Sequence, residues 1–508
     1  MVLSSVSFDY LHGVQASQIH SRLLPFLGAV LFIRFLIKRW VVKRQRLVPG
    51  VPIVGGDDRQ SIQKNRIRFI HDGKSMLEEG YEKWAGNIFY VPSVLGERLM
   101  IPVKYLEDLK TAPIDKVDFV ATFQEMFEGK YTTMGSRSTL HPRVVKHQLN
   151  SNLPAVMPEI QQEIKESFES EFPACDDWTE VNVVDCMTRI VARVSSRMFG
   201  GPALSRNKEW IDASIAFAID GFHGAQKIKK YPEFLKPIAK YFIPEIMSIH
   251  EHYRMAEKAA IPLLEERERL GEKALDLLYW MADQAKGDEK DHKFLASILL
   301  KVSFAAIHTS AAAPSQLIYD LCAMPEYIKP LRDEINSVLE DGAIGKKGFL
   351  QMPKMDSIMK ESQRFNPLLL ITFERVVTED YKLSDGFVIP ANTTIGVPTQ
   401  AISMDPKIYD NPTRFDGFRF EKLRQNPEQN GKAQYAASNH NSMSFGYGRH
   451  ACPGRFFAAN EIKAIMAYLL QNYDMKFKEG QKRPESLLFE TQYLPNGTAT
   501  VMFLRRNV

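Results

Sequence analysis

The chain has 508 residues, of which 44% are hydrophobic and 25% charged, as is usual for a globular protein. A formal net charge of +4 on this length gives no general case for binding nucleic acid, so no such partner is predicted. The four cysteines are far apart and form no CxxC pair, which argues against a secreted disulfide scaffold and favours reduced thiols: Cys175, Cys186, Cys322 and Cys452.

The first predicted element is a hydrophobic segment near the N-terminus. Residues 23–37 read LLPFLGAVLFIRFLI, and apolar residues resume at 40–42. Because about 20 apolar residues span a bilayer, residues 23–42 are predicted to be a transmembrane anchor after a short lumenal N-terminus, residues 1–22. A cleaved signal peptide is the alternative, but no small-x-small cleavage site follows. The basic residues after the apolar run predict that the rest of the chain is cytosolic: Lys38, Arg39, Lys43, Arg44 and Arg46.

A basic, Pro/Gly-rich connector is predicted at 43–56, followed by one catalytic domain at 57–508. Short apolar runs at 88–91 and 98–101 predict a small sheet, and strand patterns return at 380–400. Between these regions the pattern is mostly helical. The predicted fold class is mainly α (α+β), with a helix-rich body and a minor antiparallel sheet. Clear helices are expected at 158–171, 255–270, 296–322 and 455–472.

One segment departs from an ordinary surface pattern. Between residues 227 and 242, five lysines alternate with apolar and aromatic residues such as Phe234, Tyr241 and Phe242. This combination is typical of a membrane interface, although a solvated loop with a few core anchors explains it equally well.

The segment 444–454 reads SFGYGRHACPG and carries the strongest chemical pattern in the chain. Its glycines allow backbone N–H groups to turn toward the sulfur of Cys452, where they would tune a bound metal. A helix that begins after Pro453 would point its positive end at the same thiolate. Phe445 can pack beside the sulfur and exclude water, and His450 is a nearby cationic group.

This segment resembles the haem-binding signature of the cytochrome P450 family, FxxGx(R/H)xCxG, with every fixed position filled. The resemblance implies the cytochrome P450 fold and the cofactor haem b, with Cys452 as the axial ligand of the iron. It also implies that His450 holds a haem propionate. Histidine stands here where arginine is most common, so this contact is expected to be weaker and pH-dependent.

Three further residues match a structural network of the family. Glu361 and Arg364 lie three positions apart on one helix face, where they can pair. Arg419, in the downstream segment FDGFRF, resembles the family's second arginine motif. The resemblance implies that the three form one buried network on the haem side of the core.

The predicted helix 296–322 carries the segment FAAIHTS, which resembles the family's distal-helix motif. In the family, the threonine at the position of Thr309 hydrogen-bonds to dioxygen and helps to deliver protons. His308 stands in place of the usual acid and is expected to relay protons. This substitution, together with the segment 131–135, is similar to fungal P450s that oxidise terpenoid skeletons.

Weaker matches concern the haem propionates and the pocket. Arg375 resembles a propionate-binding position, and Lys146 is a second candidate, although a solvated lysine is an equal alternative. The pocket residues that the resemblance implies are mostly apolar, which suits a small apolar substrate: Phe119, Phe123, Met126, Leu368, Leu369, Leu370, Thr372, Tyr493 and Leu494.

The expected activity is NADPH-driven monooxygenation of an apolar natural product, a terpenoid (diterpenoid or meroterpenoid), at the endoplasmic reticulum membrane. No GxGxxG or flavin-binding motif is found, so the expected electron donor is NADPH-cytochrome P450 reductase, with cytochrome b5 as a further candidate. Arg449, Arg455 and Lys463 are expected to face this acidic partner. The alternatives are a haem-thiolate isomerase or dehydratase, a P450 that oxidises polyketides or alkaloids, and a non-catalytic haem sensor. Thr309 argues against the isomerase and the sensor.

Overall fold

The computed structural model describes residues 47–507. The predicted anchor at 23–42 and the predicted lumenal segment at 1–22 lie outside the described residues, as does the start of the connector. Only the body from Leu47 onward is considered below.

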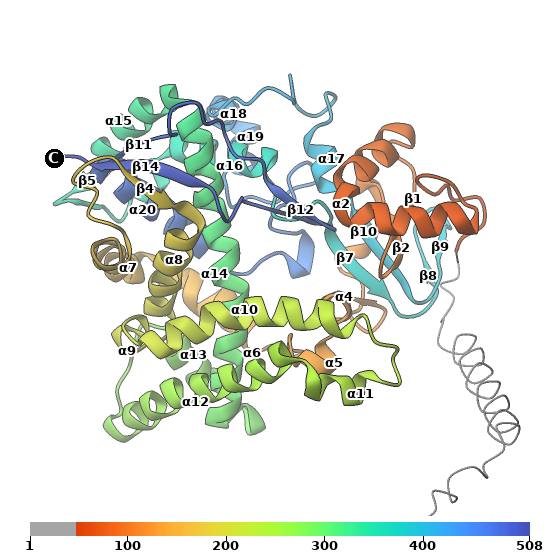
Figure 1. The fold of residues 1–508 in the computed structure, drawn as a ribbon, viewed down its shortest axis with the longest axis horizontal. Helices are drawn as coiled ribbons and strands as arrows, with labels where there is room; N and C mark the ends of the chain where they lie inside the picture. Colours follow the sequence, from red (N-terminus) through yellow and green to blue (C-terminus); the bar gives the residue numbers. More distant parts are fainter. Residues whose placement is uncertain (1–46, 508) are drawn as a thin grey trace, which may run out of the picture. The chain divides into compact units, whose positions relative to one another are not determined.

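A long helix, α14 (His292–Ala323), runs through the middle of the helical body (Figure 1). It packs against α8 (Val183–Gly200), α10 (Lys208–Ile228) and α12 (Pro244–Leu270). Asp291 begins α14, because its carboxylate accepts hydrogen bonds from the backbone N–H groups of Lys293 and Phe294. In the part of the chain that the structure describes, α14 is the one helix long and apolar enough to cross a membrane, but its packing makes it a core helix.

The other helices enclose this centre, and the sequence patterns located most of them. The predicted helix 455–472 has the bounds of α20, whereas those predicted at 158–171 and 255–270 begin earlier. Helix α7 (Asn150–Glu171) contains both Pro154 and Pro158 in its interior. The helix predicted to begin at Pro158 therefore begins earlier, and this proline does not mark its start. The remaining helices are α2 (Arg59–Lys83), α3 (Leu106–Leu109), α4 (Phe119–Met126), α5 (Gly129–Thr132), α6 (Leu140–Val144), α7 (Asn150–Glu171), α9 (Pro202–Ser205), α11 (Lys236–Ala239), α13 (Leu277–Gln284), α15 (Ile328–Val338), α16 (Pro353–Phe365), α17 (Thr399–Ser403), α18 (Arg419–Arg424), α19 (Pro427–Ala433) and α20 (Arg455–Asn472).

The main sheet has five strands in the order β1-β2-β10-β7-β3. The runs predicted at 88–91 and 98–101 fall in β1 and β2. The prediction of a purely antiparallel sheet is wrong for one pair, because β10 lies parallel to β2; the long helical connection between them permits this pairing. The strands of this sheet are β1 (Phe89–Ser93), β2 (Gly96–Met100), β3 (Val117–Asp118), β7 (Thr372–Val377) and β10 (Thr393–Val397).

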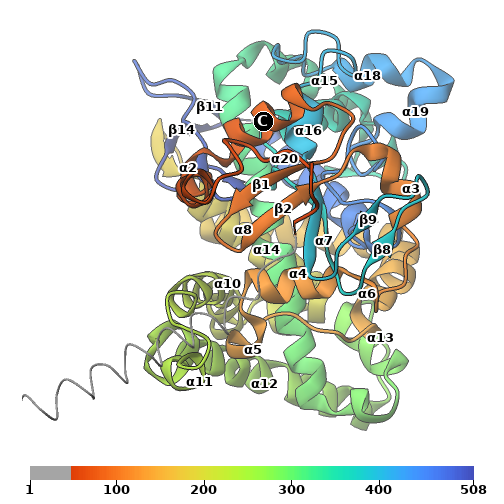
Figure 2. The ribbon, with the colours of Figure 1, turned by 90° about the vertical axis from the view of Figure 1, so that its right-hand side faces the viewer.

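Helix α2 covers the main sheet near β1 and β2 (Figure 2). Phe69 and Met76 of α2 share a buried cluster with Phe89 and Met100 of the sheet. Smaller sheets complete the fold: β11 (Tyr473–Lys476), β14 (Thr500–Arg505) and β4 (Thr179–Asn182); β12 (Leu487–Phe489) and β13 (Gln492–Leu494); β5 (Leu339–Glu340) and β6 (Ala343–Ile344); β8 (Tyr381–Lys382) and β9 (Val388–Ile389).

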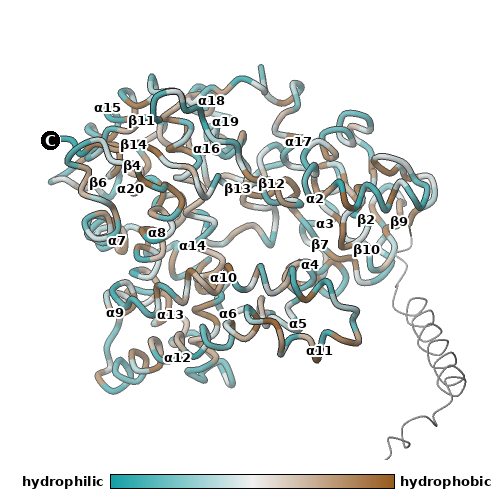
Figure 3. The backbone as a smooth tube through the Cα atoms, viewed as in Figure 1, coloured by the Kyte–Doolittle hydropathy of each residue, from teal (hydrophilic) through white to brown (hydrophobic). Residues whose placement is uncertain are grey.

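The largest buried cluster joins α7, α8, α14, α16 and α20. Hydropathy follows this arrangement: along the surface helix α12, hydrophilic and hydrophobic colours alternate, as in an amphipathic helix (Figure 3). The cluster holds α14 and α20 in place, and these two helices carry or adjoin the residues that sequence analysis selected as the site.

Candidate active site

A cavity of about 520 Å³ lies between α14, the loop before α20 and strand β7. Its wall is mainly apolar. Of the predicted pocket residues, five line it: Phe119, Leu368, Leu369, Thr372 and Tyr493. Four do not line it, namely Phe123, Met126, Leu370 and Leu494. Phe123 packs instead against Phe127 and Phe304, and Leu370 is fully buried in the core.

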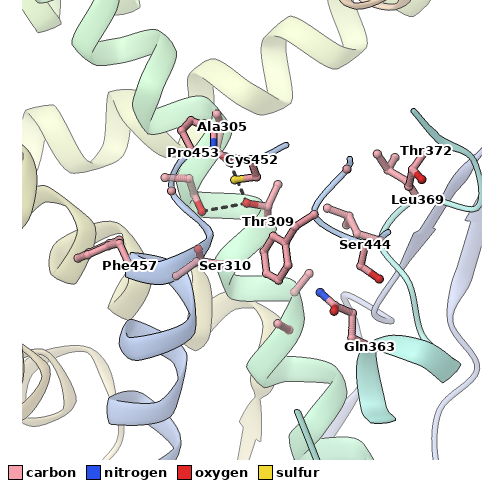
Figure 4. Close-up of a pocket in the computed structure, with 18 of the residues that line it drawn as sticks. Ala305, Thr309, Ser310, Gln363, Leu369, Thr372, Ser444, Cys452, Pro453 and Phe457 are labelled. Atoms are coloured by element: carbon pink, nitrogen blue, oxygen red, sulfur yellow. Dashed lines mark hydrogen bonds between the residues drawn. The ribbon is translucent and has the colours of Figure 1, made fainter. Parts of the chain in front are cut away.

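Cys452 faces this cavity from the loop that precedes α20 (Figure 4). Its backbone N–H donates to the Phe445 carbonyl at 2.8 Å, which closes the loop. Gly446 and Gly448 have φ of 73° and 72°, in the left-handed region that glycine adopts without strain. Burial raises the pKa of the Cys452 thiol, and the backbone N–H groups of Gly454 and Arg455 act in the opposite direction. The Cys452 side chain is exposed to the cavity and has backbone donors suited to a metal-bound thiolate.

Phe445 lies in the cavity wall beside Cys452. Its ring packs edge-to-face on the buried Tyr435, with the ring centres 5.4 Å apart. This contact fixes an aromatic ring next to the sulfur, as the sequence pattern predicts.

A cationic group lies at another part of the cavity wall. The Arg375 guanidinium is buried and packs 4.9 Å from the centre of the Phe119 ring, and His450 stacks on the same ring at 5.4 Å. Burial lowers the pKa of Arg375 to about 10 and also lowers that of His450. Among the described residues, no carboxylate forms an ion pair with Arg375, so a buried positive charge is available to an anionic ligand.

Lys146 does not join this group. A π-helical turn, Val145–Leu149, changes the direction of the side chains after α6. Lys146, within this turn, is exposed and does not line the cavity, so its propionate contact stays a prediction. His141 lines the cavity instead, with a buried Nδ1 atom that has no hydrogen-bond partner. Sequence analysis did not select His141, which lies in α6 before this turn.

Thr309 lies on the cavity face of α14 (Figure 4). Its Oγ1 donates to the Ala305 carbonyl at 2.8 Å, within the helix, and the side chain is exposed to the cavity. His308 points elsewhere. Its Nε2 lies 3.0 Å from the carbonyl oxygen of Ile215 in α10, and burial lowers its pKa. The structure therefore does not bring His308 and Thr309 together, and the relay role of His308 stays a prediction that requires the ring to leave Ile215.

Glu361, Arg364 and Arg419 form one buried network behind the cavity. Arg364 donates to both carboxylate oxygens of Glu361 at 2.8 and 2.9 Å, and Arg419 Nε lies 3.2 Å from each. Glu361 is completely buried. The remaining guanidinium nitrogen of Arg364, Nη1, donates to the carbonyls of Ser403 and Pro412. The charges are therefore paired, and the N–H groups of Arg364 have hydrogen-bond acceptors.

The basic surface near Cys452 is smaller than predicted. Arg449 is exposed and Arg455 is half-buried. Lys463 is buried, pairs with Asp356 at 2.5 Å and donates to the Phe349 carbonyl, so the prediction that it faces a partner is wrong. It points into the body because α20 packs against the start of α16 on that side.

The residues present fit a haem. A cysteine with backbone donors is exposed to the cavity, and Arg375 with His450 would hold the anionic propionates. The fold and the site together define a haem-thiolate protein of the oxidoreductase class.

Comparisons with known proteins agree with this class. The cytochrome P450 family model matches residues 124–501. The cytochrome P450 monooxygenase braC of Annulohypoxylon truncatum is 38% identical over 490 residues, which cover 94% of this chain and 96% of that protein. The cytochrome P450 monooxygenase AN1598 of Emericella nidulans is 38% identical over 87% of this chain and 85% of its own length. The ent-kaurene oxidase P450-4 of Gibberella fujikuroi is 33% identical over 87% of this chain and 90% of its own length.

The chain therefore belongs to the cytochrome P450 family. It is a monooxygenase of the fungal secondary-metabolism type, an oxidoreductase that incorporates oxygen from O₂, and its cofactor is haem b.

Proposed function

We propose that this monooxygenase oxidises an apolar terpenoid skeleton, a diterpenoid or meroterpenoid, with electrons from NADPH-cytochrome P450 reductase. The observation that carries the proposal is the apolar cavity onto which both Cys452 and Thr309 open. Two of the similar proteins are named ent-kaurene oxidases, and ent-kaurene is a diterpene hydrocarbon. An apolar substrate would be favoured in this cavity because its surface leaves water on binding.

Each site residue has a role in this proposal. The haem, when bound, supplies the iron at which dioxygen is activated. The Cys452 thiolate would hold the iron, and Phe445 would keep water from the sulfur. Arg375 and His450 hold the propionates by charge-assisted hydrogen bonds. Thr309 holds a proton on Oγ1 at the cavity surface and can pass it to oxygen. Glu361, Arg364 and Arg419 are structural, since none of them lines the cavity, Glu361 and Arg364 are buried and Arg419 is partly buried against them.

The reductase and cytochrome b5 would meet the surface around Arg449 and Arg455. Both are cationic and lie within three positions of Cys452 in the sequence, so an acidic partner here would be close to the haem edge. Lys463 is excluded from this surface by its ion pair with Asp356.

Membrane association is proposed at the endoplasmic reticulum, through the anchor at 23–42 and through the segment from α10 to α12. In the latter, Ile238, Tyr241 and Phe242 are 61%, 66% and 77% exposed. The half-buried Lys240 lies in the same short helical turn as Tyr241 and Phe242, and Lys227 and Lys230 nearby are exposed. Large apolar side chains at the surface, next to lysines, are suited to an interface with anionic lipid.

The first test is the carbon monoxide difference spectrum of the reduced protein. A band near 450 nm in the wild type and its loss in Cys452→Ser are expected, because only a thiolate ligand gives this band. A band near 420 nm in every fresh wild-type preparation would contradict the ligand assignment.

The second test is turnover of ent-kaurene with reductase and NADPH. An oxygenated product labelled from ¹⁸O₂ supports the proposal. A rearranged product formed without reductase would instead indicate an isomerase or dehydratase. Labelled products from polyketide or alkaloid probes alone would overturn the terpenoid assignment.

A further inference from the structure

Lys301 is a cationic residue in the apolar cavity with no role in the site described so far. It lies on α14, four and eight positions before Ala305 and Thr309, and all three residues line the cavity. Positions i, i+4 and i+8 share one face of a helix, so Lys301 and Thr309 are about 12 Å apart along the helix axis.

The Lys301 ammonium has no anionic partner among the residues that the structure describes. Burial alone lowers its pKa, and no carboxylate counteracts the effect. Its Nζ atom lies over the face of the Tyr253 ring, 5.6 Å from the ring centre. An unpaired charge in an apolar cavity costs free energy, which an anionic ligand would recover.

A second unsatisfied polar group lies close by. His141 lines the same cavity, and its Nδ1 atom is buried without a hydrogen-bond partner. Burial and, to a smaller extent, the charge of Lys301 together lower the pKa of His141 to about 4, and both side chains line the same cavity. A neutral imidazole can donate one hydrogen bond beside the ammonium, so together they match the two oxygens of a carboxylate.

We propose that Lys301, with His141, binds a carboxylate group of the substrate. This inference rests on the proposed function and narrows its substrate class to apolar skeletons that bear one carboxylate. The carboxylate would lie about two helical turns from the carbon presented to Thr309. Lys301 is then a specificity-determining residue, because it would favour acids over the corresponding esters and hydrocarbons.

A haem propionate is also a carboxylate and could bind Lys301 in the same way. A substrate carboxylate must therefore be distinguished from a haem propionate. Arg375 and His450 already provide a cationic group around Phe119. We therefore assign the Lys301 site to the substrate, and haem content is the readout that separates the two sources.

The experiment uses the full-length holoenzyme and measures spectral dissociation constants from the Soret shift. The probes are dehydroabietic acid and lauric acid, each with its methyl ester. The variants are Lys301→Met and Lys301→Arg, with Lys293→Met as matched control, since Lys293 is an exposed lysine of the same helix. Haem content and the reduced carbon monoxide spectrum are recorded for each protein.

We expect the wild type and Lys293→Met to bind at least one acid tenfold or more tightly than its ester, as a charge-assisted hydrogen bond would give. In Lys301→Met this preference should disappear through weaker binding of the acid, and Lys301→Arg should retain part of it. Equal binding of acid and ester by the wild type, no shift with either acid, or a preference that survives in Lys301→Met would overturn the proposal.

Loss of haem in Lys301→Met with an unchanged acid preference would assign Lys301 to a propionate and would also overturn it. Failure of the proposed function has a different signature, because the wild type would then give no oxygenated product from a terpenoid probe with reductase and NADPH, whatever its preference between acid and ester.

Discussion

Both carboxylate oxygens of Glu361 lie 3.2 Å from Nε of Arg419, although 58 positions separate the two residues in the sequence. This contact ties α16 to the segment that leads toward the Cys452 loop. Since Glu361 is completely buried, its charge depends on Arg419 and Arg364 for compensation.

Glu361→Gln should therefore destabilise the holoenzyme severely. The amide keeps the shape but leaves two buried arginines without their counter-charge, which costs about 3–5 kcal/mol when one partner of a buried pair is removed. Urea unfolding followed at the Soret band measures the change. Asp333→Asn is the control, because it removes an exposed ion pair with Lys329 and should have little effect. Equal midpoints for the two variants would contradict this prediction.

Thr309→Ala should uncouple electron consumption from product formation. The variant loses the hydroxyl at the cavity surface but keeps the helix, since alanine favours helices. Product formed per NADPH should fall about tenfold or more, with the electrons recovered as peroxide, whereas Thr309→Ser should stay close to the wild type. Stoichiometry of NADPH, peroxide and product provides the measurement, and unchanged coupling in Thr309→Ala would refute the role.

Glu461 of α20 should make stability depend on pH. It is completely buried and accepts a hydrogen bond from Ser195 at 2.7 Å, and burial raises its pKa from 4.5 to about 8. Between these values the unfolded chain loses the proton while the folded chain keeps it. Stability from this group is thus full below pH 4.5 and falls as the pH rises to 8, by at most about 1.4 kcal/mol per pH unit.

Glu461→Gln, which stays neutral, should accordingly raise the melting temperature relative to the wild type, with a gain that grows from pH 5 to pH 8 and then levels off. Thermal unfolding of the holoenzymes across this range is the measurement. The exposed Glu479→Gln is the control and should show no such trend. A gain independent of pH would show that Glu461 does not titrate in this window.

Phe242→Trp should report insertion into lipid. In full-length protein reconstituted in vesicles, its emission should shift to the blue and be quenched by brominated acyl chains, because Phe242 is 77% exposed in the apolar segment near α11. Leu350→Trp, at a position that is 82% exposed in another part of the fold, should remain unquenched. Equal quenching at both positions would argue against a specific membrane-facing segment.

Much of this arrangement could be predicted from local patterns. The bounds of α20 follow from Pro453 and Gly454 before the helix, and Glu361 and Arg364 are close because a helix brings i and i+3 together. The resemblance to the family added Arg419, whose distance in sequence no local rule bridges.

The errors share a physical cause, since each depends on the direction of a side chain. Lys463 was misplaced because burial of a lysine depends on Asp356, more than 100 positions away, and the π-helical turn that contains Lys146 has no signal in the sequence. His308 and Thr309 are neighbours in sequence, yet adjacent helical positions point about 100° apart, toward Ile215 and the cavity respectively. The spacing of residues in the sequence predicts that their side chains share one face of a helix only where the helix keeps its regular period of about 3.6 residues per turn.

The loop that carries Cys452 is closed by its own backbone bond to Phe445 and by two glycines, none of which belongs to the wall formed by α14. The part that holds the iron and the part that selects the substrate are therefore built from separate pieces of chain. Sequences that descend from this one can therefore change the residues around Lys301 and accept new substrates while the residues that bind the haem iron stay the same. The same independence gives a protein engineer a region in which many substitutions can be tried at little risk to the cofactor.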